Sequence, residues 1–150
     1  MSSVRAQFQQ IRKDIDETVV TEMESRAVRG SNELRTAARE VLRGQGGGRR
    51  YRVPGTGAYY TASAPGAPPA MRTGDFRRHW IPSAGLQGHK GGNVFVSAIE
   101  NSLMVGTKKR YLLGELLEDG TSKMAPRPHH DRIRDQARPG IVRIYNEPYF

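Results

Sequence analysis

The stretch EDGTSKMAPRPHHDR, residues 118–132, brings together glycine, hydroxyl, lysine, proline and histidine side chains. These residue types serve three kinds of site: loops that bind phosphate, metal centres and rigid docking segments. A P-loop requires Gly, four residues and then Gly-Lys-Ser or Gly-Lys-Thr, so that backbone amides and the lysine meet on the phosphates. Here the order is Gly120-Thr121-Ser122-Lys123, and no β-strand is expected to lead into it. The stretch is therefore not interpreted as a P-loop.

The histidines of this stretch do not have the spacing of a metal site. His129 and His130 are adjacent and generally point in different directions, whereas paired histidine ligands on a helix lie one turn apart. His79 and His89 have no companion at that spacing, and the chain has no cysteine to supply a thiolate. We therefore expect no metal and no cofactor, and interpret His129 and His130 as surface residues or as the start of a helix.

No local pattern singles out a catalytic nucleophile. Serine, histidine and aspartate are all present, but the Gly-x-Ser-x-Gly pattern that exposes a nucleophilic serine on a sharp turn is missing from the sequence. The sequence therefore gives no reason to expect an enzyme.

Positive charge is concentrated in the middle of the chain. Its 24 basic and 15 acidic residues give a net charge of +9, of which residues 44–92 contribute +6, from 7 basic residues and 1 acidic residue. Arg49, Arg50 and Arg52 alternate there with tyrosines, a composition that can hold phosphates and stack bases. Tyrosine and arginine are also enriched at protein interfaces. Nucleic acid, a protein partner and solvent therefore all remain open as what this segment faces.

A long amphipathic helix is expected at the N-terminus. Apolar residues recur at spacings of three and four between Val4 and Val41, which predicts one helix from Ser3 to Arg43 with a weak point at Gly30 and Ser31. Such a helix is longer than a domain of this size needs, so part of it is expected to pack on another subunit. The alternative is a pair of ordinary helices that fold back at Gly30.

Glycine and proline predict an irregular segment after this helix. The glycines of 44–48 end it and begin a flexible loop. A short hairpin or an extended excursion is expected from 51–53 and 58–62, because the turn sequence Pro54-Gly55-Thr56-Gly57 separates them. The segment 63–69 has too much proline for a central strand and should lie extended on a surface.

A second hairpin is expected from residues 93–99 and 102–106, followed by a leucine-rich helix from Tyr111 to Glu118 that ends at Gly120. Thr121 to Lys123 should then turn the chain.

Prolines should shape the rest of the chain. Pro126 and Pro128 hold it extended before two short helices, 129–137 and 140–145, which Pro139 divides.

These elements predict an α+β fold with antiparallel strands. The 150 residues suit a single domain, with a long N-terminal helix in 1–43, a basic Gly- and Pro-rich loop and arm in 44–92, and a β-hairpin with C-terminal helices in 93–150. No stretch approaches the roughly 20 apolar residues of a membrane span, so no membrane partner is expected.

Three segments in order, taken together, resemble the small neck, or tail-completion, proteins of long-tailed bacteriophages (siphophages). They are Ser63-Ala-Pro-Gly-Ala-Pro-Pro-Ala70, Arg72-Thr-Gly-Asp-Phe-Arg-Arg78 and Gly120-Thr-Ser-Lys-Met-Ala-Pro-Arg-Pro128, the last after a hairpin and Tyr111. The family has an Ala-Ser-Ala-Pro-Gly-x-Pro-Pro segment, a Thr-Gly-x-Leu-Arg element and a Leu-Glu-aromatic-Gly-Thr-Ser-Lys-Met-x-x-Arg-Pro element. This chain departs from it at Phe76, Asp119 and His129, and residues 141–150 match no family pattern.

The resemblance implies a structural virion protein, assembled in the host cytoplasm, that forms a sixfold homo-oligomeric ring at the head-tail junction. Its partners would be phage connector, terminator and tail tube proteins, with DNA nearby in the channel. The implied assembly surface comprises Pro65, Gly66, Pro68, Pro69, Thr73, Gly74, Gly120, Thr121, Ser122, Lys123, Pro126 and Pro128. The alternatives are a tail terminator of the same region or, in a different class, a nucleic-acid-binding module that uses Arg49, Arg50 and Arg52.

Overall fold

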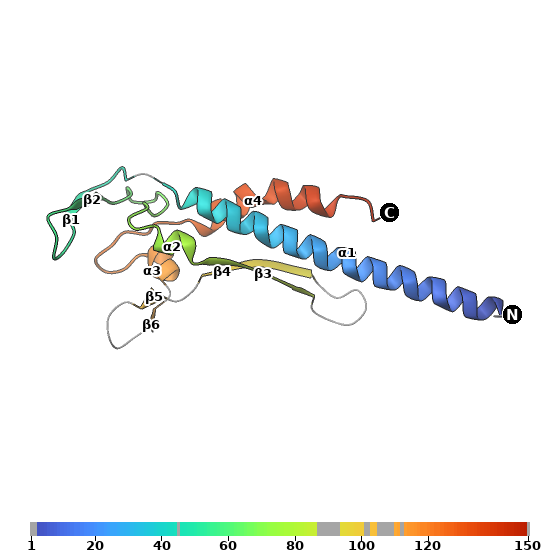
Figure 1. Ribbon diagram of the computed structural model, residues 1–150. Helices are drawn as coiled ribbons and strands as arrows, with labels where there is room; N and C mark the ends of the chain where they lie inside the picture. Colours follow the sequence, from blue (N-terminus) through green and yellow to red (C-terminus); the bar gives the residue numbers. More distant parts are fainter. Residues whose placement is uncertain are drawn as a thin grey trace.

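A computed structural model of the chain describes residues 3–44, 46–86, 94–100, 103–104, 110–111 and 113–149, with side chains described outside 85–112. The described elements form an elongated α+β molecule built along one helix, α1, which runs from Val4 to Val41 (Figure 1). The hydroxyl of Ser3 caps this helix by accepting a hydrogen bond from the amide of Ala6 at 3.3 Å. The predicted fold class is confirmed.

The helix α1 continues through the predicted weak point. Gly30 and Ser31 are both buried inside it, and the Ser31 hydroxyl donates to the carbonyl of Val28 at 2.8 Å. The prediction of one long helix is therefore confirmed, and the alternative of two helices folded back at Gly30 is wrong. Burial at this point offsets the intrinsic cost of glycine in a helix, about 1 kcal/mol relative to alanine.

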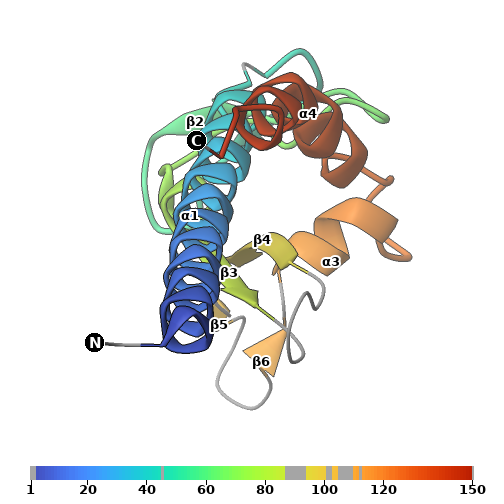
Figure 2. The same ribbon diagram turned by 90° about the vertical axis from the view of Figure 1, so that its right-hand side faces the viewer.

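A second helix, α4 (His130–Tyr145), lies antiparallel along the C-terminal half of α1 (Figures 1 and 2). Contacts with α1 run in opposite order along the two helices: Gln136 donates to Glu40, and Gly140 lies beside Glu33. The prediction of two short helices divided by Pro139 is wrong, because Pro139 lies within α4. Packing keeps the helix intact, since Ala137 and Ile144, on either side of the proline, are both buried.

The sheet component consists of three separate two-stranded pairs. The first, β1 (Arg50–Arg52) with β2 (Tyr59–Thr61), is the hairpin predicted around Pro54 to Gly57. The second joins β3 (Trp80–Leu86) to β4 (Val94–Glu100), which both contact α1, and the third joins β5 (Leu103–Met104) to β6 (Arg110–Tyr111).

The prediction of a hairpin between 93–99 and 102–106 is therefore wrong, because β4 pairs with a strand in the segment assigned to the loop and arm. Residues 93, 102 and 105–106 of that prediction lie outside the described residues.

The core lies where α1, α4 and β3 meet. Its buried side chains are mostly small, which lets the two helices approach closely, and Trp80 fills the space beneath them: the cluster comprises Ala37, Ala38, Leu42, Trp80, Ile133 and Ala137. Two short helices, α2 (Asp75–Arg78) and α3 (Leu113–Asp119), lie at the end of the molecule where α1 terminates (Figure 1). The predicted leucine-rich helix is thus confirmed as α3, except that Tyr111 belongs to β6.

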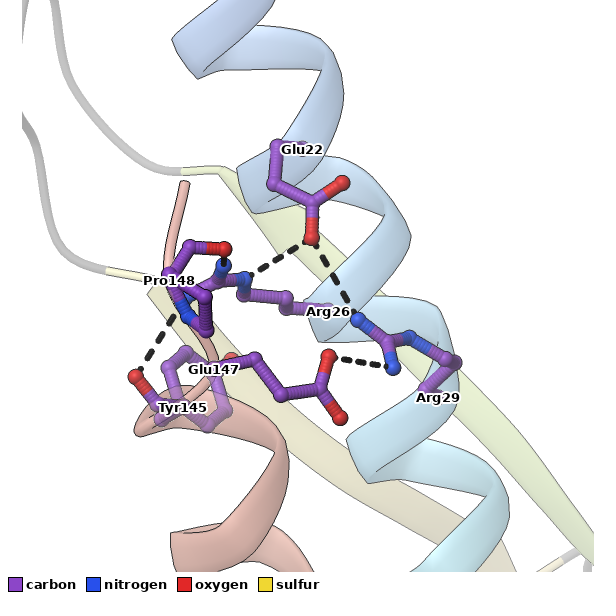
Figure 3. Close-up of polar contacts among 6 residues, drawn as sticks. All are labelled: Glu22, Arg26, Arg29, Tyr145, Glu147 and Pro148. Atoms are coloured by element: carbon purple, nitrogen blue, oxygen red, sulfur yellow. Dashed lines mark hydrogen bonds and ion pairs between the residues drawn. The ribbon is translucent and has the colours of Figure 1, made fainter. Parts of the chain in front are cut away.

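A buried arginine fastens the C-terminal tail, residues 146–149, to α1 (Figure 3). The guanidinium of Arg26 is 0% exposed and donates to the carboxylate of Glu22 at 3.0 Å and to the carbonyls of Tyr145 and Pro148 at 3.3 and 2.9 Å. The ring of Tyr149 lies over the guanidinium carbon at 3.9 Å. Arg29 adds an ion pair to Glu147 at 2.7 Å. The tail, which matched no family pattern, is thus held by three kinds of contact: hydrogen bonds to backbone carbonyls, a cation–π contact and an ion pair.

Candidate interface groove

A groove opens at the end of the molecule where α1 terminates. It has a volume of about 870 Å³, and its walls come from β1 and β2, from the segment 62–77 and from α3 with the chain that follows it to Arg127. We call it the interface groove. Each of the three sequence segments that carry the family resemblance contributes to its lining, although the third is far from the first two in the chain.

Two of these segments are held together by hydrogen bonds. The amide of Gly66 donates to the carbonyl of Pro126 at 3.0 Å, and the guanidinium of Arg127 donates to the carbonyl of Ser63 at 3.3 Å. Arg132 reaches back from α4 to the carbonyl of Gly66 at 3.3 Å. The proline-rich segment is therefore fixed on the chain between α3 and α4. It is not extended throughout, as was predicted, because Ala64 to Ala67 form a turn in which the amide of Ala67 donates to the carbonyl of Ala64 at 3.1 Å.

The groove gathers about half of the predicted assembly residues. Pro65, Pro69, Thr73, Gly74, Lys123 and, from the basic loop, Arg49 line it. The others border it or lie outside it: Arg50, Arg52, Gly66, Pro68, Gly120, Thr121, Ser122, Pro126 and Pro128. Sequence reasoning missed several lining residues, among them Met71, Arg77, Met124 and Arg127. Leu113 and Leu117 also line the groove, and their spacing of four on a short helix is the signal that could have revealed a shared face.

The charge of the groove is strongly positive. Its lining includes five basic side chains, namely Arg49, Arg72, Arg77, Lys123 and Arg127, against one acid, Asp75. That acid is already engaged, because it accepts a hydrogen bond from the Thr73 hydroxyl at 2.6 Å and pairs with Arg78 at 2.5 Å. These two hydrogen bonds hold the pKa of Asp75 below its ordinary value. The groove therefore presents apolar surface surrounded by cations.

The tyrosines at the rim of the groove already have partners for their ring faces. Tyr51 and Tyr60 stack with ring centroids 5.7 Å apart. The guanidiniums of Arg50 and Arg72 lie over the rings of Tyr59 and Tyr60 at 4.5 and 5.2 Å. Stacking of bases would have to displace these contacts, so the arrangement favours a protein interface over a platform for single-stranded nucleic acid.

The chain between α3 and α4, residues 120–129, forms a rigid link beside the groove, which we call the elbow. Gly120 follows the last residue of α3 with φ of +76°, and Thr121 pairs with Met124 in an isolated β-bridge. The amide of Arg127 then donates to the carbonyl of Leu117 at 2.7 Å, so the elbow folds back on α3. The predicted helix end at Gly120, the turn over Thr121 to Lys123 and the helix start at His129 are confirmed.

Glu118 joins the two helices at the elbow. One of its carboxylate oxygens accepts from the amides of His129 and His130 at 2.8 and 3.2 Å, and the Nδ1 atom of His129 lies 2.9 Å from the same oxygen. His129 is the N-cap residue of α4 and makes no side-chain cap itself, so Glu118 supplies the cap from α3. Its negative charge lies where the exposed amides of a helix N-terminus favour an anion.

His129 is buried, so the prediction that it lies on the surface is wrong. It is 0% exposed and makes edge contacts with the rings of Phe76 and Trp80 at centroid distances of 5.5 and 6.2 Å. Its Nδ1 atom faces two acceptors, Glu118 and the carbonyl of Arg127 at 3.1 Å, so this nitrogen carries the proton in the neutral ring. The aromatic contacts connect the elbow to α2 and β3.

Glu118, His129 and His130 are also close enough to bind a metal ion, with potential ligand atoms within 4.8 Å of one another. Sequence spacing did not reveal this grouping, because Glu118 lies eleven residues before His129 and joins the two histidines only through the fold. The amides of α4 nevertheless point at the carboxylate oxygen and oppose a cation there. Helix capping accounts for the two amide contacts of this oxygen, and the imidazoles of His129 and His130 lie 2.9 and 3.7 Å from it.

Acid should destabilise the elbow. Burial lowers the pKa of His129, although the carbonyl of Arg127 and the charge of Glu118 oppose the effect. Burial also disfavours ionised Glu118, but hydrogen bonds from the amides of His129 and His130 outweigh it and lower the pKa of that carboxyl. Both residues bind protons more readily in the unfolded chain than in the folded one. Their contribution to the free energy of unfolding is therefore complete above the ordinary pKa values, 6.5 for His129 and 4.5 for Glu118, and is lost as the pH falls below each value in turn.

We therefore expect the free energy of unfolding to fall as the pH drops from 7 to 5, and this fall to be smaller in His129→Gln. Denaturant titrations at several pH values measure it. His130→Gln is the comparison variant: its side chain is 48% exposed, and its charge is one of the causes that lower the pKa of His129, so the fall in this variant should lie between those of the parent protein and of His129→Gln. If the free energy of unfolding falls as much with pH in His129→Gln as in the parent protein, another residue takes up the proton.

None of the described helices is both long enough and apolar enough to span a membrane. No known protein-family model, curated protein or solved structure matches this chain significantly.

Proposed function

We propose that this protein is a structural subunit of the head-to-tail connection of a long-tailed bacteriophage, a neck or tail-completion protein. It assembles with further copies into a ring, sixfold by family resemblance, between the portal-bound connector and the tail tube. The role involves no catalytic step and no cofactor. A tail terminator of the same region is the nearest alternative.

One observation carries the proposal. The segments Ser63–Ala70, Arg72–Arg78 and Gly120–Pro128, on which the resemblance rests, contribute to one groove although more than forty residues separate the second from the third. Its lining is rich in tyrosine, arginine and methionine, the residue types enriched at protein interfaces. A surface built from the residues shared with assembly proteins supports a role in assembly.

The nucleic-acid-binding alternative receives less support. Arg50 and Arg72 cover tyrosine faces, and Tyr51 and Tyr60 cover each other, so the rings best placed for bases are occupied. A nucleic-acid-binding module should bind DNA with an affinity that falls steeply with salt. We expect this chain to show little such binding at physiological salt, where a filter or gel assay measures it.

Electron micrographs of phage particles made without this protein test the proposal. We expect full heads and separate tails of normal length, because the connection between them is missing. Complementation with the intact protein should restore joined virions and serves as the control. Overlong tails would instead support the terminator role, and normal virions would contradict both roles.

A further inference from the structure

The N-terminal part of α1 exposes a row of apolar side chains. Residues 4–18, which we call the arm, are all exposed, and the large apolar residues among them recur at spacings of four, three and four: Val4, Phe8, Ile11 and Ile15. Phe8 is 70% exposed and Ile11 is 57% exposed. Solvent-exposed apolar rows of this kind mark interaction surfaces.

The apolar row lies on the same side of α1 that α4 covers nearer the C-terminal end of the helix. At about 100° per residue, Phe8, Ile11 and Ile15 lie in line with Glu33 and Glu40, the α1 residues next to Gly140 and Gln136 of α4. However, α4 ends at Tyr145, and Figure 1 shows the arm extending beyond it. The arm therefore offers the same packing side of the helix without a covering element among the described residues.

Acidic side chains accompany the apolar row where the arm joins the body of the molecule. Residues 14–24 contain five acids, namely Asp14, Asp16, Glu17, Glu22 and Glu24, and no lysine or arginine. Asp14 and Asp16 flank Ile15 directly, and both are exposed. The arm as a whole is neutral, because Arg5, Arg12 and Lys13 balance its three acids, and Glu17 and Glu22 already pair with cations of α1. Asp14 and Asp16, on either side of Ile15, are therefore the acids that can face the interface groove, which combines Leu113, Leu117 and Met124 with five cations.

We propose that the arm of one copy docks in the interface groove of a second copy. The apolar row packs on the leucine and methionine side chains of the groove, and Asp14 and Asp16 approach the exposed cations Arg72 and Lys123. The apolar contact supplies most of the affinity, whereas the charges fix the register and exclude wrong pairings.

The positions of the two surfaces determine how copies would be joined. The arm lies at one end of α1 and the groove at the other (Figure 1). Every copy can therefore insert its own arm into one neighbour and accept the arm of another. Such a head-to-tail contact forms a ring when the rotations between successive copies add up to a full turn. The inference rests on the self-assembly part of the proposed function and not on its place in a virion.

Crosslinking tests the contact directly, because the chain contains no cysteine. Phe8→Cys places one thiol on the arm and Met71→Cys places one in the groove, both at exposed positions. With a short bis-maleimide, we expect crosslinked dimers in an equimolar mixture of the two variants and none in either variant alone. Thr36→Cys, on an exposed part of α1 outside both surfaces, is the matched control and should not crosslink to either.

Charge reversal supplies a second measurement. Asp14→Lys with Asp16→Lys should weaken self-association at least tenfold in sedimentation, and so should Arg72→Glu with Lys123→Glu. A mixture of the two double variants should recover association, because the charges are again opposite at the mixed contact.

Several results would overturn the inference: dimers from Phe8→Cys alone, which indicate pairing between arms; no recovery in the charge-reversed mixture; or a monomeric mass at every concentration. The result of these measurements is independent of the result of the phage experiment. Crosslinks from arm to groove in a protein whose loss leaves virions normal would contradict the proposed function alone, and unattached tails without such crosslinks would contradict the inference alone.

Discussion

Arg26→Ala is expected to lower the free energy of unfolding by about 3 kcal/mol, since hydrogen bonds to a charged group contribute about 1.5–3 kcal/mol each. The substitution removes the donors to Glu22, Tyr145 and Pro148 and the cation above the ring of Tyr149. Because this side chain is fully buried, its loss also leaves a cavity between α1 and the tail. Denaturant-induced unfolding measures the effect.

The matched control for this substitution is Arg29→Ala. Arg29 lies on the same helix and pairs with Glu22 and Glu147, but its side chain is 41% exposed, so its ion pairs should contribute no more than about 1 kcal/mol. Hydrogen exchange gives a second readout, since only Arg26→Ala should free residues 146–149 from α1. Equal loss of stability in the two variants would mean that the buried guanidinium has no special role.

Gly120→Ala is expected to cost about 3 kcal/mol, the second large effect, because two penalties add. The φ of +76° lies in the left-handed region, which costs a residue with a Cβ about 1–2 kcal/mol. A Cβ built there would also lie 2.6 Å from the carbonyl oxygen of Met124 and 2.8 Å from the nitrogen of Pro126, and backbone atoms cannot rotate away. The elbow would have to open to accommodate a methyl group.

Gly55→Ala separates these two penalties. Gly55 has nearly the same φ, +74°, but a Cβ there meets nothing within 4 Å. Thermal unfolding of this variant should show only the backbone cost of about 1–2 kcal/mol. If both alanine variants unfold at the same temperature, crowding at the elbow does not contribute.

The features that the sequence predicted correctly depend on local signals. The helix α1 follows from its apolar spacing and from the cap at Ser3, and β1 with β2 follows from the turn at Pro54 to Gly57. The elbow likewise follows from Gly120 and the prolines after it, because these residues restrict the backbone whatever surrounds them.

The features that the sequence did not predict depend on contacts between different segments of the chain. Pro82 and Gly85 are atypical of a strand, so β3 was assigned to the loop and arm, although Gly88, Gly91 and Gly92 before β4 are a turn signal in the sequence. Pro139 normally breaks a helix at a cost of about 3 kcal/mol, and burial of Ala137 and Ile144 on either side of it overrides that local preference. The cap that Glu118 provides exists only after α3 and α4 have met.

The continuity of α1 also has a mechanical consequence. With Gly30 and Ser31 inside an unbroken helix of 38 residues, the rod contains no hinge at which its exposed end could swing independently. A pull on that end is transmitted along the axis and is resisted first at Arg26, where the tail is fastened, and then in shear along the antiparallel face of α4. Contacts loaded in shear yield together rather than one after another, so a molecule built on such a rod resists tension as a single body.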